Sequence, residues 1–410
     1  MTTQQLPQPH SNALKRLAKI AGYTIQALHM ETGIPLGTLY RWADGRQVIP
    51  RTDREKLAGI IGCKVEDLAP YPLSPGEDNA MLAGIKRPTG KVPPMKDNRA
   101  KRVPLGSDGC FSFGKRATTT LVLDGNGTEA YVPEHIHTFY DPQPATFFPE
   151  VLQAKEQIQQ EELQKNGELW NSEKYHLSRI VVSRESMHEH MTLRLWLKPR
   201  DHYTGLATRR CLGDPAFRQK YLAENDWYTP IVGMSMSMGV DMTVVSSDGY
   251  ALLTQRGQNQ SVHQGMFNCS VSEAVSPLLD RSTTSQAPDL YRCASRGFAE
   301  ELGLHESVDF SVSDILFLSF TVDTQYALYG LRGMVKVQRS AEEILQRWQA
   351  GVKDKRENKQ MVAVPFTPEA ISSFVSAHEA FTPGGLVCLY HALVHEFGRH
   401  DVDQVIASFS

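Results

Sequence analysis

The sequence predicts a multidomain chain in which a small all-α domain precedes a larger α+β body. Over residues 11–69, apolar residues recur at helical spacing between Gly and Pro breaks. Over 71–109, Pro, Gly and charged residues dominate without periodicity, and after that strand-like and helical patterns alternate. We therefore expect a helical domain over 1–70, a flexible linker over 71–109 and an α+β body from residue 110 to the end.

The composition places the chain among soluble globular proteins. Of its 410 residues, 41% are apolar and 22% are charged, which is enough apolar material for two or three domains. No apolar run is long enough to span a membrane, and the first residues lack the pattern of a signal peptide, so we expect a cytoplasmic protein with no membrane partner. The six cysteines are scattered without a CxxC pair and are expected to be reduced thiols.

The small net charge of −3 hides an asymmetry along the chain. Residues 1–116 hold 18 of the 43 Lys and Arg and 10 of the 46 Asp and Glu, which leaves 25 basic against 36 acidic residues in the remainder. The basic N-terminal part is the part expected to meet a polyanion.

The body is predicted to begin with an extension that contains a sheet (110–230) and to continue with a second region (231–410). An Asp-Gly turn in "SSDGY" is expected to join two strands within 231–256. The other expected strands are 118–124, 175–183, 191–198, 314–320 and 326–337, and the expected helices are 148–167, 293–303, 340–350, 368–379 and 384–398.

The stretch "YTIQALHMETGIPLGTLYRWADGRQVIP" resembles the helix-turn-helix of phage-repressor-type proteins. Thr24 is placed to cap a first helix, Gly33 supplies the turn, and "PLGTLYRWADG" forms a second helix. This resemblance covers about 60 residues and implies binding of double-stranded DNA, with the second helix in the major groove. A helical interaction module is the alternative, and Trp42 is expected to be a core residue in either case.

The resemblance also implies which residues meet the DNA. Thr38 and Arg41 are expected to contact base edges, with Tyr40 on the same outer side of the second helix. Arg46 and Arg51 are expected to contact phosphates. Proteins of this type commonly bind paired half-sites, so the resemblance also implies a homodimer.

The segment "GVDMTVVSSDGYALLTQRG…GMFNCSVSEAV…SRGFAEELGL" looks like a Nudix domain, the family that cleaves nucleoside diphosphates linked to another group. Arg296, Glu300, Glu301 and Gly303 fit the helical half of the family's signature. The resemblance implies catalytic roles for Arg296, Glu300 and Glu301, and a Mg²⁺ ion held by carboxylates that lie on one helix face against a pyrophosphate.

Two departures from that signature bear on the metal site. Position 297, where the family has its first metal-binding Glu, is Gly, so Gly297→Glu is expected to restore a carboxylate face. Glu273 stands 23 residues before Arg296 where the signature places 8, an insertion of about 15 residues, yet it remains a candidate metal ligand. The alternative for Glu300 and Glu301 is a solvated helix face with an ion pair between Arg296 and Glu300.

The preceding region is similar to the lead-in of Nudix proteins that hydrolyse UDP-sugars. This similarity rests on Trp170, Tyr175 and Tyr203 and on "TGLATRR" (204–210), which is interpreted as a turn. Arg209 and Arg210 are then candidate contacts for a phosphate or uronate group, or else a surface pair. Arg256, at the end of "YALLTQR", is a third candidate ligand contact.

Three other patterns favour structural roles. "MSMSMGVDM" (234–242) alternates Met with small residues, as a buried strand does. "HEH" (188–190) has no further metal ligands near it in the sequence, and His391 and His395 lie at helical spacing in apolar surroundings that favour a packing helix over a zinc site.

Three functional classes remain open from the sequence. A DNA-binding regulator whose Nudix-like domain senses a nucleoside-diphosphate-linked metabolite explains both the N-terminal domain and the incomplete signature. A Mg²⁺-dependent Nudix hydrolase explains the retained Arg296, Glu300 and Glu301. An adaptor that uses both domains for protein contacts explains least.

Overall fold

The computed structural model describes residues 14–68 and 109–409 with gaps, and these form parts of two compact units, Met1–Asn98 and Arg99–Ser410. The predicted linker over 71–109 lies outside the described residues except at Gly109. The gaps are residues 15–16, 19–20, 22, 44–48, 64–67, 170, 186–189, 224, 226, 259, 261 and 283–285.

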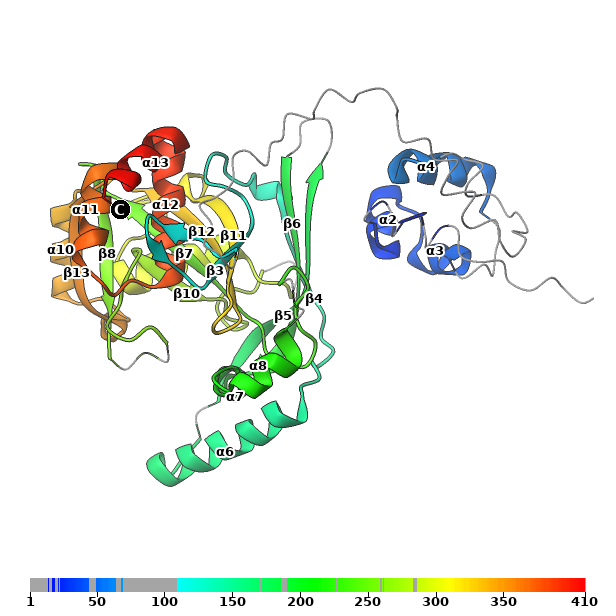
Figure 1. Cartoon of the computed structure of the whole chain (residues 1–410), viewed down its shortest axis with the longest axis horizontal. Helices are drawn as coiled ribbons and strands as arrows, with labels where there is room; N and C mark the ends of the chain where they lie inside the picture. Colours follow the sequence, from blue (N-terminus) through cyan, green and yellow to red (C-terminus); the bar gives the residue numbers. More distant parts are fainter. Residues whose placement is uncertain are drawn as a thin grey trace, which may run out of the picture. The chain divides into compact units, whose positions relative to one another are not determined.

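The first unit contains a helix, a short turn and a second helix, followed by a third helix (Figure 1). The hydroxyl group of Thr24 accepts a hydrogen bond from the backbone N–H of Ala27 at 3.0 Å and so caps the first helix. Gly33 ends that helix with φ 69°, a left-handed conformation that costs glycine no steric penalty. The three helices are α2 (Ile25–Thr32), α3 (Leu36–Ala43) and α4 (Arg51–Ile61).

The core of the first unit combines the inward faces of these helices with buried residues outside them, such as Leu14 and Ala18. Leu28, Leu39 and Leu57 are fully buried, and Trp42 is 6% exposed. The predictions that Thr24 caps, that Gly33 turns and that Trp42 packs in the core are confirmed.

An eight-stranded mixed sheet forms the centre of the second unit. Its strand order is β13-β8-β7-β12-β11-β3, with β10 paired to β7 and β9 paired to β8. The pairing of β7 with β12 is parallel and its other pairings are antiparallel. The strands are β3 (Thr120–Asp124), β7 (Ser237–Val245), β8 (Tyr250–Arg256), β9 (Phe267–Asn268), β10 (Val271–Ala274), β11 (Leu316–Asp323), β12 (Leu328–Lys336) and β13 (Asn358–Pro365).

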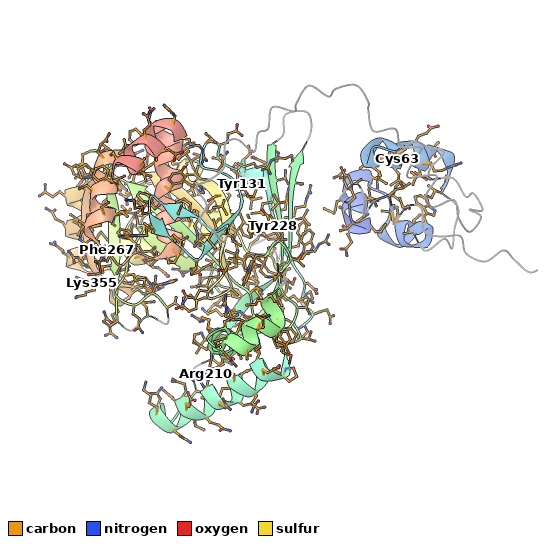
Figure 2. The ribbon with its side chains drawn as sticks, in the orientation of Figure 1. Cys63, Tyr131, Arg210, Tyr228, Phe267 and Lys355 are labelled. Atoms are coloured by element: carbon orange, nitrogen blue, oxygen red, sulfur yellow. The ribbon has the colours of Figure 1, made fainter. Side chains whose placement is uncertain are left out.

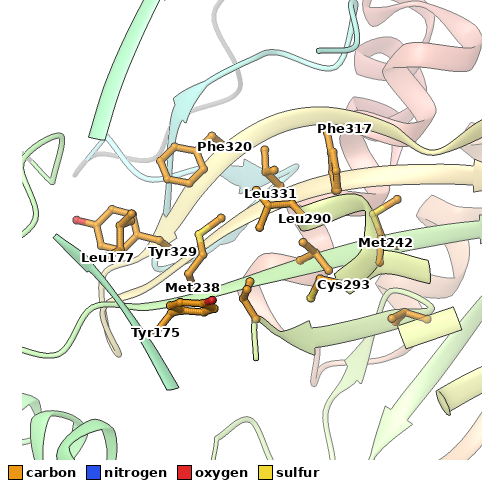
Figure 3. Close-up of a cluster of buried hydrophobic side chains, with 14 of the residues drawn as sticks. Tyr175, Leu177, Met238, Met242, Leu290, Cys293, Phe317, Phe320, Tyr329 and Leu331 are labelled. Carbon is orange, nitrogen blue, oxygen red and sulfur yellow. The ribbon is translucent and has the colours of Figure 1, made fainter. Parts of the chain in front are cut away.

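The sheet carries a separate hydrophobic core on each face. Alternate residues of β7, namely Met238, Val240 and Met242, enter a core shared with α9, as Figure 3 shows for Met238 and Met242. The other core is formed with α12, which packs on β7, β11 and β12. The helices around the sheet are α9 (Leu290–Gly297), the π-helical turn η4 (Phe298–Leu302), α10 (Ala341–Ala350), α11 (Pro368–Ala377), α12 (Pro383–Phe397) and α13 (Arg399–Ser408).

A three-stranded sheet with order β4-β6-β5 and three helices precede the large sheet in the chain. The strand β3 of this early region pairs with β11, so it belongs to the large sheet. The elements are β4 (Ile136–Tyr140), β5 (Glu173–Glu185), β6 (His190–Asp201), α6 (Pro149–Asn166), α7 (His202–Leu212) and α8 (Pro215–Leu222). Short elements complete the unit: β1 (Ser112–Phe113), β2 (Arg116–Ala117) and the 3₁₀ turns η3 (Pro133–His135), η5 (Val312–Asp314) and η6 (Lys355–Glu357).

Several predicted elements are confirmed and one is wrong. The Asp-Gly turn joins β7 to β8, with Gly249 at φ 83°, and the Met-rich segment is buried. The interpretation of 204–210 as a turn is wrong, because these residues lie inside α7. Asp201 caps that helix by accepting from the backbone N–H of Thr204 at 2.9 Å, and this cap outweighs the poor helix propensity of the Thr-Gly pair. Among the described residues, no helix is long and apolar enough to cross a bilayer.

Candidate functional site

Arg296 is the centre of a cluster of acidic side chains at the end of α9. Its guanidinium group forms two hydrogen bonds with Asp280, Nε to Oδ1 at 2.7 Å and Nη2 to Oδ2 at 2.8 Å. Nη1 lies 3.0 Å from Glu273 Oε1 and 3.1 Å from Glu300 Oε2. One guanidinium group therefore contacts three carboxylates, more negative charge than it can balance alone.

The position of Arg296 follows from local structure. Asp289 caps α9 by accepting from the backbone N–H groups of Tyr291 and Arg292, which starts the helix beside β10. Asp280 belongs to the segment that lengthens the spacing between Glu273 and Arg296. Its side chain is fully buried and also accepts from the backbone N–H of Ser276 at 2.7 Å. The inserted segment thus supplies the strongest partner of Arg296.

Glu300 and Glu301 lie in the π-helical turn and point to different surroundings. Glu300 pairs with Arg296 and with Lys353. Glu301 is 3% exposed, and its two carboxylate oxygens accept from the backbone N–H of Ser272 at 3.1 Å and from Asn358 Nδ2 at 2.9 Å. The expected common carboxylate face is therefore not formed, because the two neighbouring side chains are held by different partners.

Burial and mutual repulsion shift the pKa values of these acids. Burial raises the pKa of Glu273 to about 7 despite the attraction of Arg296. Burial, with Glu273 and Glu357 adding to it, raises the pKa of Glu301 well above its usual value. For Glu300, burial acts in the same direction, but the hydrogen bonds from Lys353 and Arg296 outweigh it and lower the pKa.

The side chains around Arg296 do not fit a Mg²⁺ site as they are arranged. Mg²⁺ requires near-octahedral oxygen ligands, whereas Glu273, Glu300 and Glu301 are already engaged by protein donors. Across the described part of the chain, no three His, Cys, Asp or Glu side chains are grouped to hold a metal ion.

A cavity of about 370 Å³ lies next to this cluster, with Glu273 in its lining. Its volume is within the range of small-molecule sites. Five Lys and Arg side chains line it, together with two histidines: Lys174, Arg200, Arg209, Arg256, Arg332, His202 and His263. Basic groups on several strands and on α7 therefore face one space, which suits an anionic ligand.

Two of the three ligand contacts proposed from the sequence lie at the cavity, and the third does not. Arg209 and Arg256 line the cavity. Arg210 is exposed, and its guanidinium group donates two hydrogen bonds to Glu161 of α6, at 2.8 and 2.6 Å (Figure 2). Sequence reasoning missed Lys174, Arg200 and Asp280, because only the fold brings β5, β6 and the inserted segment to this site.

The other sequence candidates take structural roles or lie outside the description. His391 is fully buried, and its Nδ1 lies 2.7 Å from Ser319 Oγ, as expected for a packing helix. Burial lowers the pKa of His391 to about 3. His188, Glu189 and Trp170 lie outside the described residues.

The proposed DNA-contacting residues are described only in part. Thr38 is half-buried on α3. Tyr40 and Arg41 belong to α3 and Arg51 begins α4, but their side chains lie outside the description. Arg46 lies outside the described residues altogether.

Comparison with known proteins gives limited information. No protein-family model and no curated protein matches the chain. Among solved structures, protein DR0079 from Deinococcus radiodurans is similar at 16% identity and a TM-score of 0.23, over 36% of this chain and 76% of that chain. The MutT protein from Methanosarcina mazei is similar at 13% identity and a TM-score of 0.24, over 41% of this chain and 93% of that one. Similarities of this size do not place the chain in a family.

Proposed function

We propose that this protein is a DNA-binding transcriptional regulator whose second unit binds a nucleoside-diphosphate-linked metabolite. The observation that carries the sensing part is the position of Arg296 among Asp280, Glu273 and Glu300. Glu273 and Glu300, carboxylates that a hydrolase of the resembled family would offer to a metal ion, are here paired with Arg296. The neighbouring basic cavity then provides binding without hydrolysis.

The DNA-binding part rests on the first unit. Its α2 and α3 are joined by a three-residue turn that begins at Gly33, and both helices pack through Leu28 and Leu39. The excess of basic residues in the N-terminal part of the sequence supplies attraction to a polyanion. A cytoplasmic homodimer that binds paired half-sites in double-stranded DNA belongs to this proposal.

One observation favours a hydrolase as the second candidate. Glu273, Glu300 and Glu301 are brought to the same end of α9, and the raised pKa of Glu273, about 7, suits a general base at neutral pH. A metal-assisted reaction would require these carboxylates to leave their present donors.

A ligand screen on the full chain tests the proposal against this alternative. Nucleoside-diphosphate compounds, UDP-sugars included, are added with Mg²⁺ and with EDTA, thermal stability is recorded, and any stabilising compound is analysed for products. We expect stabilisation without turnover and an effect of the same compound on DNA affinity. Mg²⁺-dependent release of a nucleoside monophosphate would establish the hydrolase instead.

A further inference from the structure

One wall of the cavity is formed by basic residues from the region that precedes the large sheet. Lys174 comes from β5, Arg200 from β6 and Arg209 from α7, and all three line the same space. Glu273 and Glu357 line the same cavity. The wall therefore borders the acidic cluster but consists of different elements.

Arg200 is held in this wall by neutral oxygen atoms. Its Nε donates to the carbonyl of Tyr175 at 3.0 Å, Nη2 to the hydroxyl of Ser237 at 2.9 Å and Nη1 to the carbonyl of Asp201 at 3.1 Å. A Cβ atom at Gly205 would lie 2.4 Å from Nη1, so α7 leaves space for the guanidinium group by having no side chain there. The fold thus positions a charge that these hydrogen bonds do not neutralise.

The basic groups of the wall repel one another. Burial, with Arg209 next, lowers the pKa of Arg200 to about 9, and burial with Arg200 lowers the pKa of Lys174. Burial, with Arg209 and Lys174 next, lowers the pKa of His202 to about 4. An anion in the cavity would relieve this repulsion.

The carboxylates of the neighbouring acidic cluster, by contrast, have partners within the protein. Glu300 is paired with Arg296 and Lys353, and Glu301 accepts from Ser272 and Asn358. Two of the acids that line the cavity are paired as well, Glu273 with Arg296 and Asp241 with Arg332, and Lys174, Arg200 and Arg209 add positive charge to the same lining.

We propose that Lys174, Arg200 and Arg209 bind the phosphate groups of the ligand directly, without a divalent metal ion. This inference rests on the proposed function, since it takes the ligand of the cavity to be a nucleoside-diphosphate compound. Arg200 and Arg209 offer planar donor pairs that match phosphate oxygens, and Lys174 adds a point charge. Recognition of this kind needs no carboxylate of the acidic cluster.

The test uses inorganic pyrophosphate and UDP-glucose as probes of the full chain, by isothermal titration calorimetry with EDTA and with Mg²⁺. We expect the affinity for UDP-glucose in EDTA to remain within about twofold of that with Mg²⁺. Arg209→Met and Lys174→Met should each weaken binding by about tenfold, the loss of one charge-assisted hydrogen-bonding partner. Pyrophosphate, too, should bind the wild-type chain more tightly than it binds either variant.

Arg210→Met is the matched control, because the neighbouring Arg210 pairs with Glu161 away from the cavity, and it should leave both affinities unchanged. Arg209→Lys separates charge from packing: it should retain more affinity than Arg209→Met if charge is what binds. Circular dichroism melts of all variants identify any that fail to fold.

Two failures are distinguishable. UDP-glucose binding could instead be lost in EDTA, restored by Mg²⁺ and unchanged by Arg209→Met. That result would overturn the proposal that the wall binds phosphate without a metal ion, while leaving the metabolite-binding function in place. An absence of binding by every nucleoside-diphosphate compound, with and without Mg²⁺, would overturn the proposed function itself.

Discussion

Gly297 of α9 lies against Val271 of β10, and a Cβ atom at position 297 would stand 2.6 Å from Val271 Cγ1 and 3.2 Å from Glu273 Cβ. Val271 is fully buried, so it has no solvent side toward which to move. The missing side chain lets the helix approach the strand that carries Glu273. This contact corrects the expectation that a carboxylate at position 297 would simply complete a metal-binding face.

Gly297→Ala and Gly297→Glu should therefore both destabilise the second unit. The favourable change in helix propensity, about 1 kcal/mol, is opposed by overpacking, which typically costs about 1–3 kcal/mol, and Glu adds the burial of a charge. Urea denaturation should show a lower midpoint for Ala and a still lower one for Glu, without new pyrophosphatase activity. Wild-type stability of Gly297→Glu together with Mg²⁺-dependent turnover would refute this account.

Arg296→Met should be among the most destabilising substitutions in the second unit. It leaves the fully buried carboxylate of Asp280 without its cation, a change that costs about 3–5 kcal/mol. Adding Asp280→Asn to the same chain should recover part of the loss, because no buried charge then remains unpaired. A double-mutant cycle by urea denaturation measures the coupling, and strictly additive effects would argue against a direct ion pair.

Local sequence patterns predict much of the fold but only part of the site, where Arg296, Glu273 and Glu300 do come together. The turn at Gly249, the Met-rich strand β7 and the cap at Thr24 each follow from nearby residues, and the structure places them as predicted. The prediction at α7 was wrong because Thr204 and Gly205 are poor helix formers, whereas the Asp201 cap starts a helix there.

The site depends on contacts between residues far apart in the sequence. Arg200 and Lys174 line the same cavity as Arg256 only because β5 and β6 lie beside the large sheet. No periodic pattern in the sequence predicts that packing. Arg209 and Arg210 illustrate the same limit, since one helical step separates a cavity-lining residue from an exposed ion pair. Asp280 carries no signal in sequence beyond its place in an insertion.

Glu273→Gln should alter how stability depends on pH. The pKa of Glu273 is raised from 4.5 to about 7 in the folded protein, so folding takes up a proton, and this stability is present below pH 4.5 and lost as the pH rises through about 7. Gln removes the titration. The difference in unfolding free energy, variant minus wild type, should therefore increase by roughly 1–3 kcal/mol from pH 4.5 to 7.5, since each pKa unit corresponds to about 1.4 kcal/mol.

Urea denaturation at several pH values measures this difference. Glu369→Gln on α11 provides a control, because Glu369 is an exposed acid away from the cluster. A difference between Glu273→Gln and wild type that stays flat over this pH range would show that Glu273 titrates normally in the folded state.

Thr24→Ala should weaken the first unit through loss of the helix cap. The Thr24 hydroxyl satisfies the backbone N–H of Ala27, and removing such a cap costs about 1 kcal/mol. Thr24→Ser retains the hydroxyl oxygen and should keep most of the stability. Equal losses in the two variants, measured by thermal unfolding of the first unit, would mean that the methyl group of Thr24 and not its hydroxyl matters.

The last prediction concerns α3 and the proposed contact with DNA. Arg41→Ala should weaken binding to a selected operator by about 1–3 kcal/mol and leave non-specific binding nearly unchanged, since a side chain that contacts base edges contributes to specificity. Arg51→Ala should lower affinity for all sequences and reduce the slope of log affinity against log salt by about 1, as loss of one phosphate contact does. Met30→Ala, which changes an exposed residue of α2, is the control and should alter neither. The operator is first selected from random duplexes with the full chain, and fluorescence anisotropy at several salt concentrations then separates the two effects. Undiminished, salt-insensitive DNA binding by a chain that lacks residues 1–70 would contradict the assignment of DNA binding to this unit.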